Sequence, residues 1–288
     1  MPARAPISPP RPAPVRTGLV GAVGRTEIPA ERWQWGVTYR PRSYTSGRSF
    51  RPQDCEPQTL TVDPPPDIVE WDAWAIWWGE RCDVARPDSF DELRADAAAN
   101  LELHQSHLIE QGFWTGQVDG APMPAPNVGL ATAGAATVLG GGLSVGVVEA
   151  WRLLLGYLAT TLAGARGIIH VPHEATAALD YYGLITREGT LTVAASADHL
   201  VVPGTGYTGS GPGDVLPGGN DRWFYATSPV EVRVGPVDVT WEPVDTLDRA
   251  ADTVDVRASQ PVIAHWDRQA HGAVRVCLED PGPLCAGS

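Results

Sequence analysis

The sequence contains no lysine, so all 21 basic residues of this 288-residue chain are arginines. This absence excludes a lysine Schiff base, a phosphate-loop lysine and a lysine isopeptide crosslink. Arginine forms better bidentate, partly buried ion pairs than lysine does. Basic contacts of this chain are therefore made by guanidinium groups.

Cysteine is scarce, with four residues at Cys55, Cys82, Cys277 and Cys285. Their spacing contains no C-x-x-C pair and matches no zinc pattern. In a chain of this length they predict free or buried thiols in a reducing cytoplasm rather than a disulfide framework. We expect no metal and no cofactor.

Long uncharged apolar runs are also absent. The longest apolar stretch, Leu143 to Ala163, contains Glu149 and Arg152, so it predicts an amphipathic helix and not a membrane span. Prolines near the N-terminus occupy the place where a signal peptide has its apolar run, so we expect no secretion and no membrane partner.

What the chain does have is a strong asymmetry of charge. Residues 1–55 carry nine arginines and three acidic residues, whereas the rest carries twelve arginines and 31 acidic residues. Thirteen of the 27 prolines lie within residues 1–66, and such a segment cannot fold alone. The acidic body argues against a broad surface that coats nucleic acid. We expect the basic arm to lie on the acidic surface of another copy.

Three segments before residue 80 have distinct patterns. Residues 33–39 are typical of a strand, and residues 40–60 of a long exposed loop. Trp71–Trp78 contains four of the eleven tryptophans. Its spacing fits a helical face with Trp71, Trp74 and Trp78, or a strand face with Trp74, Ile76 and Trp78. It anchors either the core or a subunit interface.

The clearest helix covers residues 89–111. Ser89 and Glu92 form a capping box, apolar residues recur at helical spacing, and Gly112 is the expected stop. Its length of about 35 Å is typical of a spine along which other elements pack.

Residues 144–183 predict an α/β lobe, and the chain after it is largely β. A helix from Ser144 to Leu162, a buried strand at 167–171 and a helix from Pro172 to Gly183 alternate there. The 18-residue Gly/Pro loop Gly204–Asp221 is long enough to be an interaction element. The further strands are expected at 199–203, 223–227, 230–235, 237–241, 261–266 and 272–278.

Three patterns resemble catalytic or ligand sites. Gly142–Gly146 matches the G-x-S-x-G nucleophile turn, with Asp198 and His271 downstream as possible partners. Such hydrolases have several βα units before the turn, and here a proline-rich arm and one long helix precede it. Ser144 is therefore better interpreted as a helix N-cap. A serine-type hydrolase using Ser144 is the alternative function.

The other two patterns are weaker. Gly204–Gly209 matches G-x-G-x-x-G, but Ser210–Gly213 cannot start the helix that a dinucleotide site needs. No Cys or third His lies close to His104 and His107 in the sequence, and Glu174 lies beside the pair His170/His173. We interpret both pairs as structural histidines. We predict no catalytic, cofactor-binding or metal-binding residues.

Five segments carry a resemblance to a known family: Ile76–Cys82, Gly167–Pro172, Leu200–Tyr207, Phe224–Arg233 and Gly272–Val276. Through them, residues 68–280 or so resemble tailed-phage major capsid proteins of the HK97 fold, in particular those of actinobacteriophages.

The resemblance implies an α+β, HK97-like fold with five parts. They are an N-terminal arm (1–35), an extended loop that overlaps a neighbouring subunit (36–66), a peripheral domain with the spine helix 89–111 (67–142), an α/β axial domain (143–235) and C-terminal strands that return to the peripheral domain (236–288). The lysine–asparagine crosslink of the type member is impossible here because the chain has no lysine.

The implied function is self-assembly into the icosahedral head shell that encloses phage DNA. The implied partners are hexamers and pentamers of this chain, scaffold or decoration proteins, and packaged double-stranded DNA held without sequence specificity. Assembly would occur in the host cytoplasm and the product would be the virion. A tail or connector protein is the other structural alternative. The predicted inter-subunit contacts are Arg4, Arg11, Arg16, Arg25, Arg32, Trp33, Trp35, Arg40, Arg42, Arg48, Arg51 and Tyr207.

Overall fold

The computed structural model describes residues 13, 17–27, 36–39, 68–83, 90–123, 125–240, 247–248 and 253–279. Its helices are α1 (Leu19–Val23), α2 (Phe90–Thr115), α3 (Val147–Thr161) and α4 (Thr176–Tyr181), with 3-10 turns at Leu139–Gly142 and His173–Ala175. The short strands are β1 (Thr26–Glu27), β2 (Val37–Tyr39), β3 (Val69–Trp71), β5 (Gln117–Val118), β6 (Ala121–Pro122), β7 (Thr137–Val138), β8 (Val145–Gly146), β15 (Asp238–Thr240) and β16 (Leu247–Asp248). The longer strands are β4 (Trp74–Asp83), β9 (Ile168–Pro172), β10 (Ile185–Glu188), β11 (Leu191–Ala194), β12 (Leu200–Gly204), β13 (Asp221–Thr227), β14 (Val230–Val234), β17 (Thr253–Trp266) and β18 (His271–Cys277).

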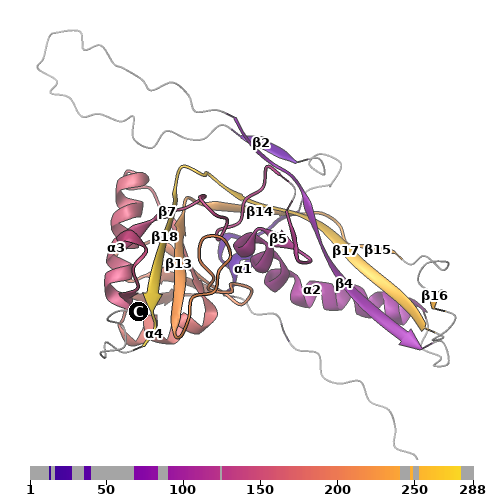
Figure 1. Cartoon of the computed structure of the whole chain (residues 1–288). Helices are drawn as coiled ribbons and strands as arrows, with labels where there is room; N and C mark the ends of the chain where they lie inside the picture. The colour runs from indigo at the N-terminus through magenta and orange to yellow at the C-terminus, as the bar shows by residue number, and fades with distance from the viewer. Residues whose placement is uncertain are drawn as a thin grey trace, which may run out of the picture.

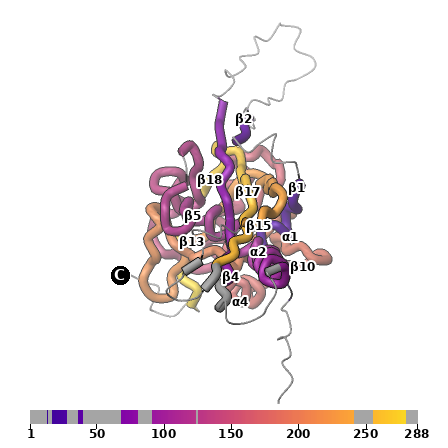
Figure 2. Tube along the Cα trace, turned by 90° about the vertical axis from the view of Figure 1, so that its right-hand side faces the viewer, coloured from indigo at the N-terminus to yellow at the C-terminus, as the bar shows by residue number. Residues whose placement is uncertain are grey.

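The first sheet has six strands and is built around β17. Strand β4 runs antiparallel to β17 from Trp74 opposite Val262 to Asp83 opposite Thr253. Strands β14, β15 and β16 also pair with β17, and β1 adds to β14 in parallel. Helix α2 lies along β4 and β17, and together they extend away from the lobe that carries α3 and α4 (Figure 1). Figure 2 shows the same elements from the side, with β4 and β17 beside the α2 coil.

The second sheet has eight strands in the order β10-β11-β12-β9-β13-β18-β7, with β8 also paired to β18. All five residues of β9 are buried, because both faces of the sheet are covered. Ile169 and Val171 pack with α3 and α4 in one core. Ile168 belongs to the other core, which includes Phe113 and Trp114 of α2. A strand that is buried on both faces has a continuous run of apolar residues in the sequence. This run is why the buried strand at 167–171 could be predicted.

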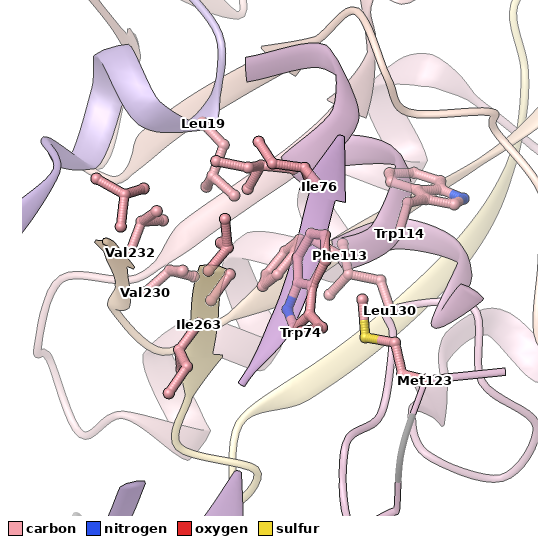
Figure 3. Packing of buried hydrophobic residues seen from close by; sticks show 14 of the residues in the cluster. Leu19, Trp74, Ile76, Phe113, Trp114, Met123, Leu130, Val230, Val232 and Ile263 are labelled. Atoms are coloured by element: carbon pink, nitrogen blue, oxygen red, sulfur yellow. The ribbon is translucent and has the colours of Figure 1, made fainter. Parts of the chain in front are cut away.

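The Trp71–Trp78 segment forms strands, which decides between the two spacings that the sequence allowed. Trp74 and Ile76 of β4 are 7% and 3% exposed and point toward α2 with the partly buried Trp78. Trp71 also belongs to this core, whereas Trp77 on the opposite strand face is 37% exposed. Figure 3 shows Trp74 and Ile76 among Phe113, Val230 and Ile263.

The spine helix is longer than predicted. Helix α2 has 26 residues and continues through Gly112 to Thr115. Its C-terminal stop is Gly116, whose φ of +69° suits glycine. Gly112 lies inside the helix, at the place where the Trp74 ring packs against it. A Cβ at this position would lie 2.8 Å from the Trp74 ring, so the site has no room for a side chain. The glycine was recognised in the sequence, but its role was assigned wrongly.

This close contact leads to a prediction about stability. Gly112→Ala is expected to lower the free energy of unfolding by roughly 1–3 kcal/mol, because the new methyl group overlaps Trp74 and Met123. The matched control is Gly156→Ala in α3, where nothing lies within 4 Å of the added Cβ. The control should raise stability by about 0.5–1 kcal/mol through helix propensity. Urea unfolding of both variants measures the two effects, and equal shifts would contradict the packing argument.

Several other expectations need correction. The second helix begins at Val147 with Gly146 as N-cap, so Ser144 does not cap it. Strands β10 and β11 were not foreseen. Strand β18 pairs with β13, β7 and β8 in the second sheet, so residues 236–288 do not all join the sheet that contains β4. Cys277 is disulfide-bonded, in contrast to the expected free thiols, and its partner lies outside the described side chains.

Candidate subunit interface

Two of the twelve predicted contact residues, Arg25 and Tyr207, lie within the described ranges. Arg25 donates from Nη1 to Oε1 of Gln105 at 3.0 Å, and its Nη2 lies 3.1 Å from a Glu27 oxygen. Tyr207 is 5% exposed, and its hydroxyl lies 2.9 Å from Nδ1 of His170. Both side chains thus have partners in their own subunit. Their contacts with a neighbouring copy stay predictions, as do those of the ten residues outside the described ranges.

The end of the N-terminal arm packs on its own subunit. Leu19 of α1 is 0% exposed and belongs to the core that contains α2 (Figure 3). Strand β1 then pairs with Arg233 and Val234 of β14. For residues 17–27, the expectation that the arm lies on another copy is therefore wrong, because this stretch has apolar residues that complete the subunit's own core.

Glu110 of α2 binds both this N-terminal segment and the loop between β12 and β13. Its side chain is 0% exposed. Atom Oε1 accepts from the backbone N of Leu19 at 2.7 Å and from Oγ of Ser106 at 3.1 Å. Atom Oε2 accepts from the backbone N of Gly206 at 2.9 Å and from Oγ1 of Thr205 at 3.3 Å. A buried carboxylate is stable when its oxygens are satisfied in this way.

The two backbone segments approach Glu110 so closely that both use glycine. A Cβ at Gly18 would lie 2.1 Å from Oε1 of Glu110, and one at Gly206 would lie 2.2 Å from the carbonyl of His107. Gly18, the N-cap of α1, has no side chain to accept from the first amides of the helix. Glu110 takes over this role. Glu110 lies four residues after Ser106 and three before Phe113, so the three residues share one face of the helix. This spacing was the sign of burial that the sequence analysis missed.

The loop between β12 and β13 has a fixed base and an exposed tip. Trp114 Nε1 donates to Oγ of Ser210 at 3.0 Å, and the Tyr225 hydroxyl donates to the Ser210 carbonyl at 3.2 Å. Beyond this base, Val215 and Leu216 are 66% and 58% exposed. The loop therefore presents two adjacent apolar side chains to solvent from a rigid support, an arrangement typical of a contact with another protein.

Buried histidines occupy the junction between α2 and the second sheet. His170 is 0% exposed. Thr227 Oγ1 donates to the Ser228 carbonyl, so it accepts from Nε2 of His170 at 2.8 Å, and Nδ1 is left to accept from Tyr207. Burial lowers the pKa of His170 to about 3, with a smaller effect from His271. Burial also lowers the pKa of His271 to about 4. Both rings are neutral near pH 7.

The structure does not assemble a serine hydrolase at Ser144. Its Oγ donates to Oδ1 of Asp221 at 2.9 Å, and Asp221 is paired with Arg275 at 2.6 Å. A carboxylate held by a guanidinium does not replace the histidine base that activates a serine. Asp198 pairs elsewhere, with Arg166, and His271 is buried beside Tyr225 and Trp266.

The remaining motifs have structural contacts. His104 stacks on Trp78 with ring centroids 4.3 Å apart, and Glu174 beside His173 pairs with Arg222. Among the described residues, no group of three or more His, Cys, Asp or Glu is arranged to hold a metal. No helix in the described part of the chain is long and apolar enough to cross a membrane.

Neither a family model nor a curated protein matches the chain, but solved structures do. A subunit of the capsid of an empty GTA particle has a TM-score of 0.54 at 12% identity, with 96% of this chain and 95% of that chain covered. A Mycobacterium phage Ogopogo chain has a TM-score of 0.56 at 10% identity, covering 96% and 97%. The holo-SrpI encapsulin from Synechococcus elongatus PCC 7942 has a TM-score of 0.52 at 11% identity, covering 96% and 94%.

These likenesses define the fold. The chain has the fold of capsid and encapsulin subunits, and it shares this fold over nearly its whole length. More particularly, this is the HK97 fold of phage capsid proteins, as the resemblance in the sequence implied.

Proposed function

We propose that this chain is the major capsid protein of a tailed phage, which assembles into the shell that encloses the phage DNA. The observation that carries the proposal is the end-to-end match to capsid subunits, which covers 96% of this chain and 95–97% of two of them. An isolated shared domain would not give this coverage in both directions. The absence of a catalytic constellation at Ser144 supports a structural role over the hydrolase.

The parts of the fold have separate roles in this proposal. The elongated layer of α2, β4 and β17 corresponds to the peripheral domain, and the lobe of the second sheet, α3 and α4 to the axial domain. The exposed Val215–Leu216 tip would contact neighbouring copies in a ring. Such obligate contacts typically bury about 2,000 Å² or more, with the affinity concentrated in apolar and arginine anchors.

The remaining features of the proposal concern the particle. Hexamers and pentamers of this chain would form an icosahedral shell, and the GTA capsid computed with C5 symmetry is a neighbour that supports rings of copies. The shell would assemble in the host cytoplasm, with scaffold or decoration proteins as further partners, and would hold double-stranded DNA without reading its sequence.

Electron microscopy of the purified chain tests the proposal. We expect closed icosahedral particles. Rings or tubes would favour a tail or connector protein instead, and a compact monomer at high concentration would overturn the proposal.

Truncation tests the role of the arm, and the structure sets where to cut. Removing residues 1–16 takes away Arg4, Arg11 and Arg16 but keeps α1. We expect a folded subunit whose yield of closed shells falls by about tenfold or more, because the arm's contacts with other copies are lost. Removing residues 1–27 also removes the buried Leu19, so the subunit itself should lose roughly 2–5 kcal/mol of stability.

Circular dichroism and particle counts separate the two truncations. Full shell yield from the chain that lacks residues 1–16 would contradict the role of the arm. Unchanged stability of the chain that lacks residues 1–27 would contradict the packing of α1.

A further inference from the structure

Cys277 is the last residue of β18, and it is disulfide-bonded and only 4% exposed. Its neighbours in the second sheet are Asp221 of β13 on one side and Gly146 of β8 on the other. Asp221 is the first residue of β13 after the long loop, and Gly146 is the N-cap of α3. A bond at Cys277 therefore acts where this loop enters the sheet and where α3 begins.

Cys82 lies too far from Cys277 to be its partner. The backbone of Cys82 pairs with Val254 in the first sheet, and Val254 also pairs with β16. Figure 1 shows β16 at the right-hand end of the molecule and β18 on the left. Two cysteines can be bridged only when their Cα atoms lie within roughly 7 Å of each other. Of the three other cysteines of the chain, Cys55 and Cys285 are left.

Position and chain length favour Cys285 over Cys55. In the sequence, Cys55 lies between β2 and β3, which pair at the top of Figure 1. Strand β18 ends on the opposite side, near α4, where Leu278 lines a small pocket with Tyr182. The entropy cost of closing a ring grows with the number of residues in it. Cys285 follows Cys277 after eight residues, whereas Cys55 is 222 residues away.

The residues between these two cysteines favour a reversal of the chain. They include Pro281 followed by Gly282, and this pair is typical of the two central positions of a type II turn. Such a turn directs the chain back toward β18. The residues just after β18 are held in place, because the backbone N of Leu278 donates to the carbonyl of Asn220 at 3.1 Å and the Asn220 side chain donates to Glu279.

We propose that Cys277 is bonded to Cys285, and that this bond is a reversible crosslink that closes when the particle leaves the reducing cytoplasm. The two thiols lose two protons and two electrons as the S–S bond forms. A small disulfide such as oxidised glutathione takes them up and becomes two thiols. Reducing conditions keep the two thiols apart, and oxidising conditions outside the cell favour the bond. The timing of closure rests on the proposed shell function, in which particles assemble in a host cell and then leave it.

Mass spectrometry of a tryptic digest, made without reduction, tests the pairing. No arginine follows Arg275, so residues 276–288 form one peptide that contains both cysteines. In the purified chain after treatment with oxidised glutathione, we expect this peptide to be lighter by two hydrogen atoms than after reduction, and to carry no second peptide. A peptide joined to Cys55 or Cys82, a peptide joined to a second copy of itself, or free thiols under these conditions would overturn the inference.

Blocking the thiols at the moment of lysis tests when the bond closes. Cells that make the chain are lysed directly into denaturant with N-ethylmaleimide, and we expect both cysteines of the 276–288 peptide to be alkylated. Shells purified without the reagent should carry the bond. A bond already present in the cells would contradict closure after release and leave the shell function intact. Absence of shells would overturn the shell function and the timing with it, while the mass of the peptide still decides the pairing.

Thermal unfolding of the full chain measures what the bond contributes. The oxidised chain should melt about 5–10 °C above the reduced chain, because the closed ring restricts the unfolded state. Cys285→Ser should melt like the reduced chain with or without reductant. Cys285 is replaced because Cys277 is itself buried. Cys55→Ser is the matched control and should keep the difference between the two conditions. Equal melting temperatures of the oxidised and reduced chains, or loss of the difference in Cys55→Ser, would show that this bond does not stabilise the sheet.

Discussion

Acidification from pH 7 to pH 4 is expected to remove on the order of 5 kcal/mol from the free energy of unfolding, through His170 and His271 alone. Both rings lie in the junction between α2 and the second sheet, where burial keeps them neutral. In the unfolded chain they take up a proton near pH 6.5, whereas in the folded chain they do so only near pH 3 and pH 4.

The sign follows from proton uptake. The unfolded state binds more protons than the folded state below pH 6.5, so protonation favours unfolding there. The stabilisation is complete above pH 6.5 and is lost as the pH falls toward the two folded-state pKa values. His199 and His265 act in the same direction, since burial lowers their pKa as well, although Asp198 and Glu231 respectively oppose this effect.

Urea unfolding followed by tryptophan fluorescence at pH 7, 5.5 and 4.5 measures this loss. The informative variant is His170→Gln, whose amide can accept from Tyr207 and donate to Thr227 without titrating. Carboxylates contribute equally in both proteins. Between the unfolded-state and folded-state pKa values of His170, the free energy of unfolding of the variant should therefore fall by about 1.4 kcal/mol less per pH unit than that of the unmodified protein. The same pH dependence in both proteins would show that His170 is not the group responsible.

Replacement of Glu110 by alanine is expected to cost about 3–5 kcal/mol of stability, the largest effect of any single substitution that we predict. The change leaves the amides of Leu19 and Gly206 buried without their acceptor, and each such group costs about 1–3 kcal/mol. Because one carboxylate holds both segments, the loss should also free α1 and the base of the loop together.

Hydrogen exchange at the amides of Leu19 and Gly206 reports this coupling, and both should lose protection in Glu110→Ala. Glu102→Ala, an exposed position of the same helix, is the matched control and should change stability by less than about 0.5 kcal/mol. Loss of protection at only one of the two amides would show that Glu110 does not join the segments.

Local patterns in the sequence predicted the elements whose contacts are continuous along the chain. The strand at 167–171 and the helix that became α2 are of this kind. The ambiguity at Trp71–Trp78 was real, because its tryptophans fit both periods, and only pairing with β17, about 180 residues later, selects the strand. Gly112 shows the same limit, since its role depends on a ring contributed by β4.

The candidate contacts were harder to predict than the fold. Arg25 was chosen for its charge, but it lies on its own subunit against Gln105. Glu110 was overlooked because a single acidic residue in a long helix usually faces water, and its burial depends on Leu19 and Gly206, which are distant in sequence. Ser144 fits a helix cap in the sequence, yet Asp221, from a strand 77 residues away, is its partner.

The positions of β17 and β18 have a consequence for biosynthesis. Among the described residues, β4 pairs only with β17, and one edge of β13 pairs with β18. The first sheet therefore cannot close until the ribosome has released the segment up to about Trp266, and the second sheet not until about Cys277. A nascent chain that still lacks these strands keeps both sheets incomplete, and the unpaired strands are the surface that a chaperone would need to shield.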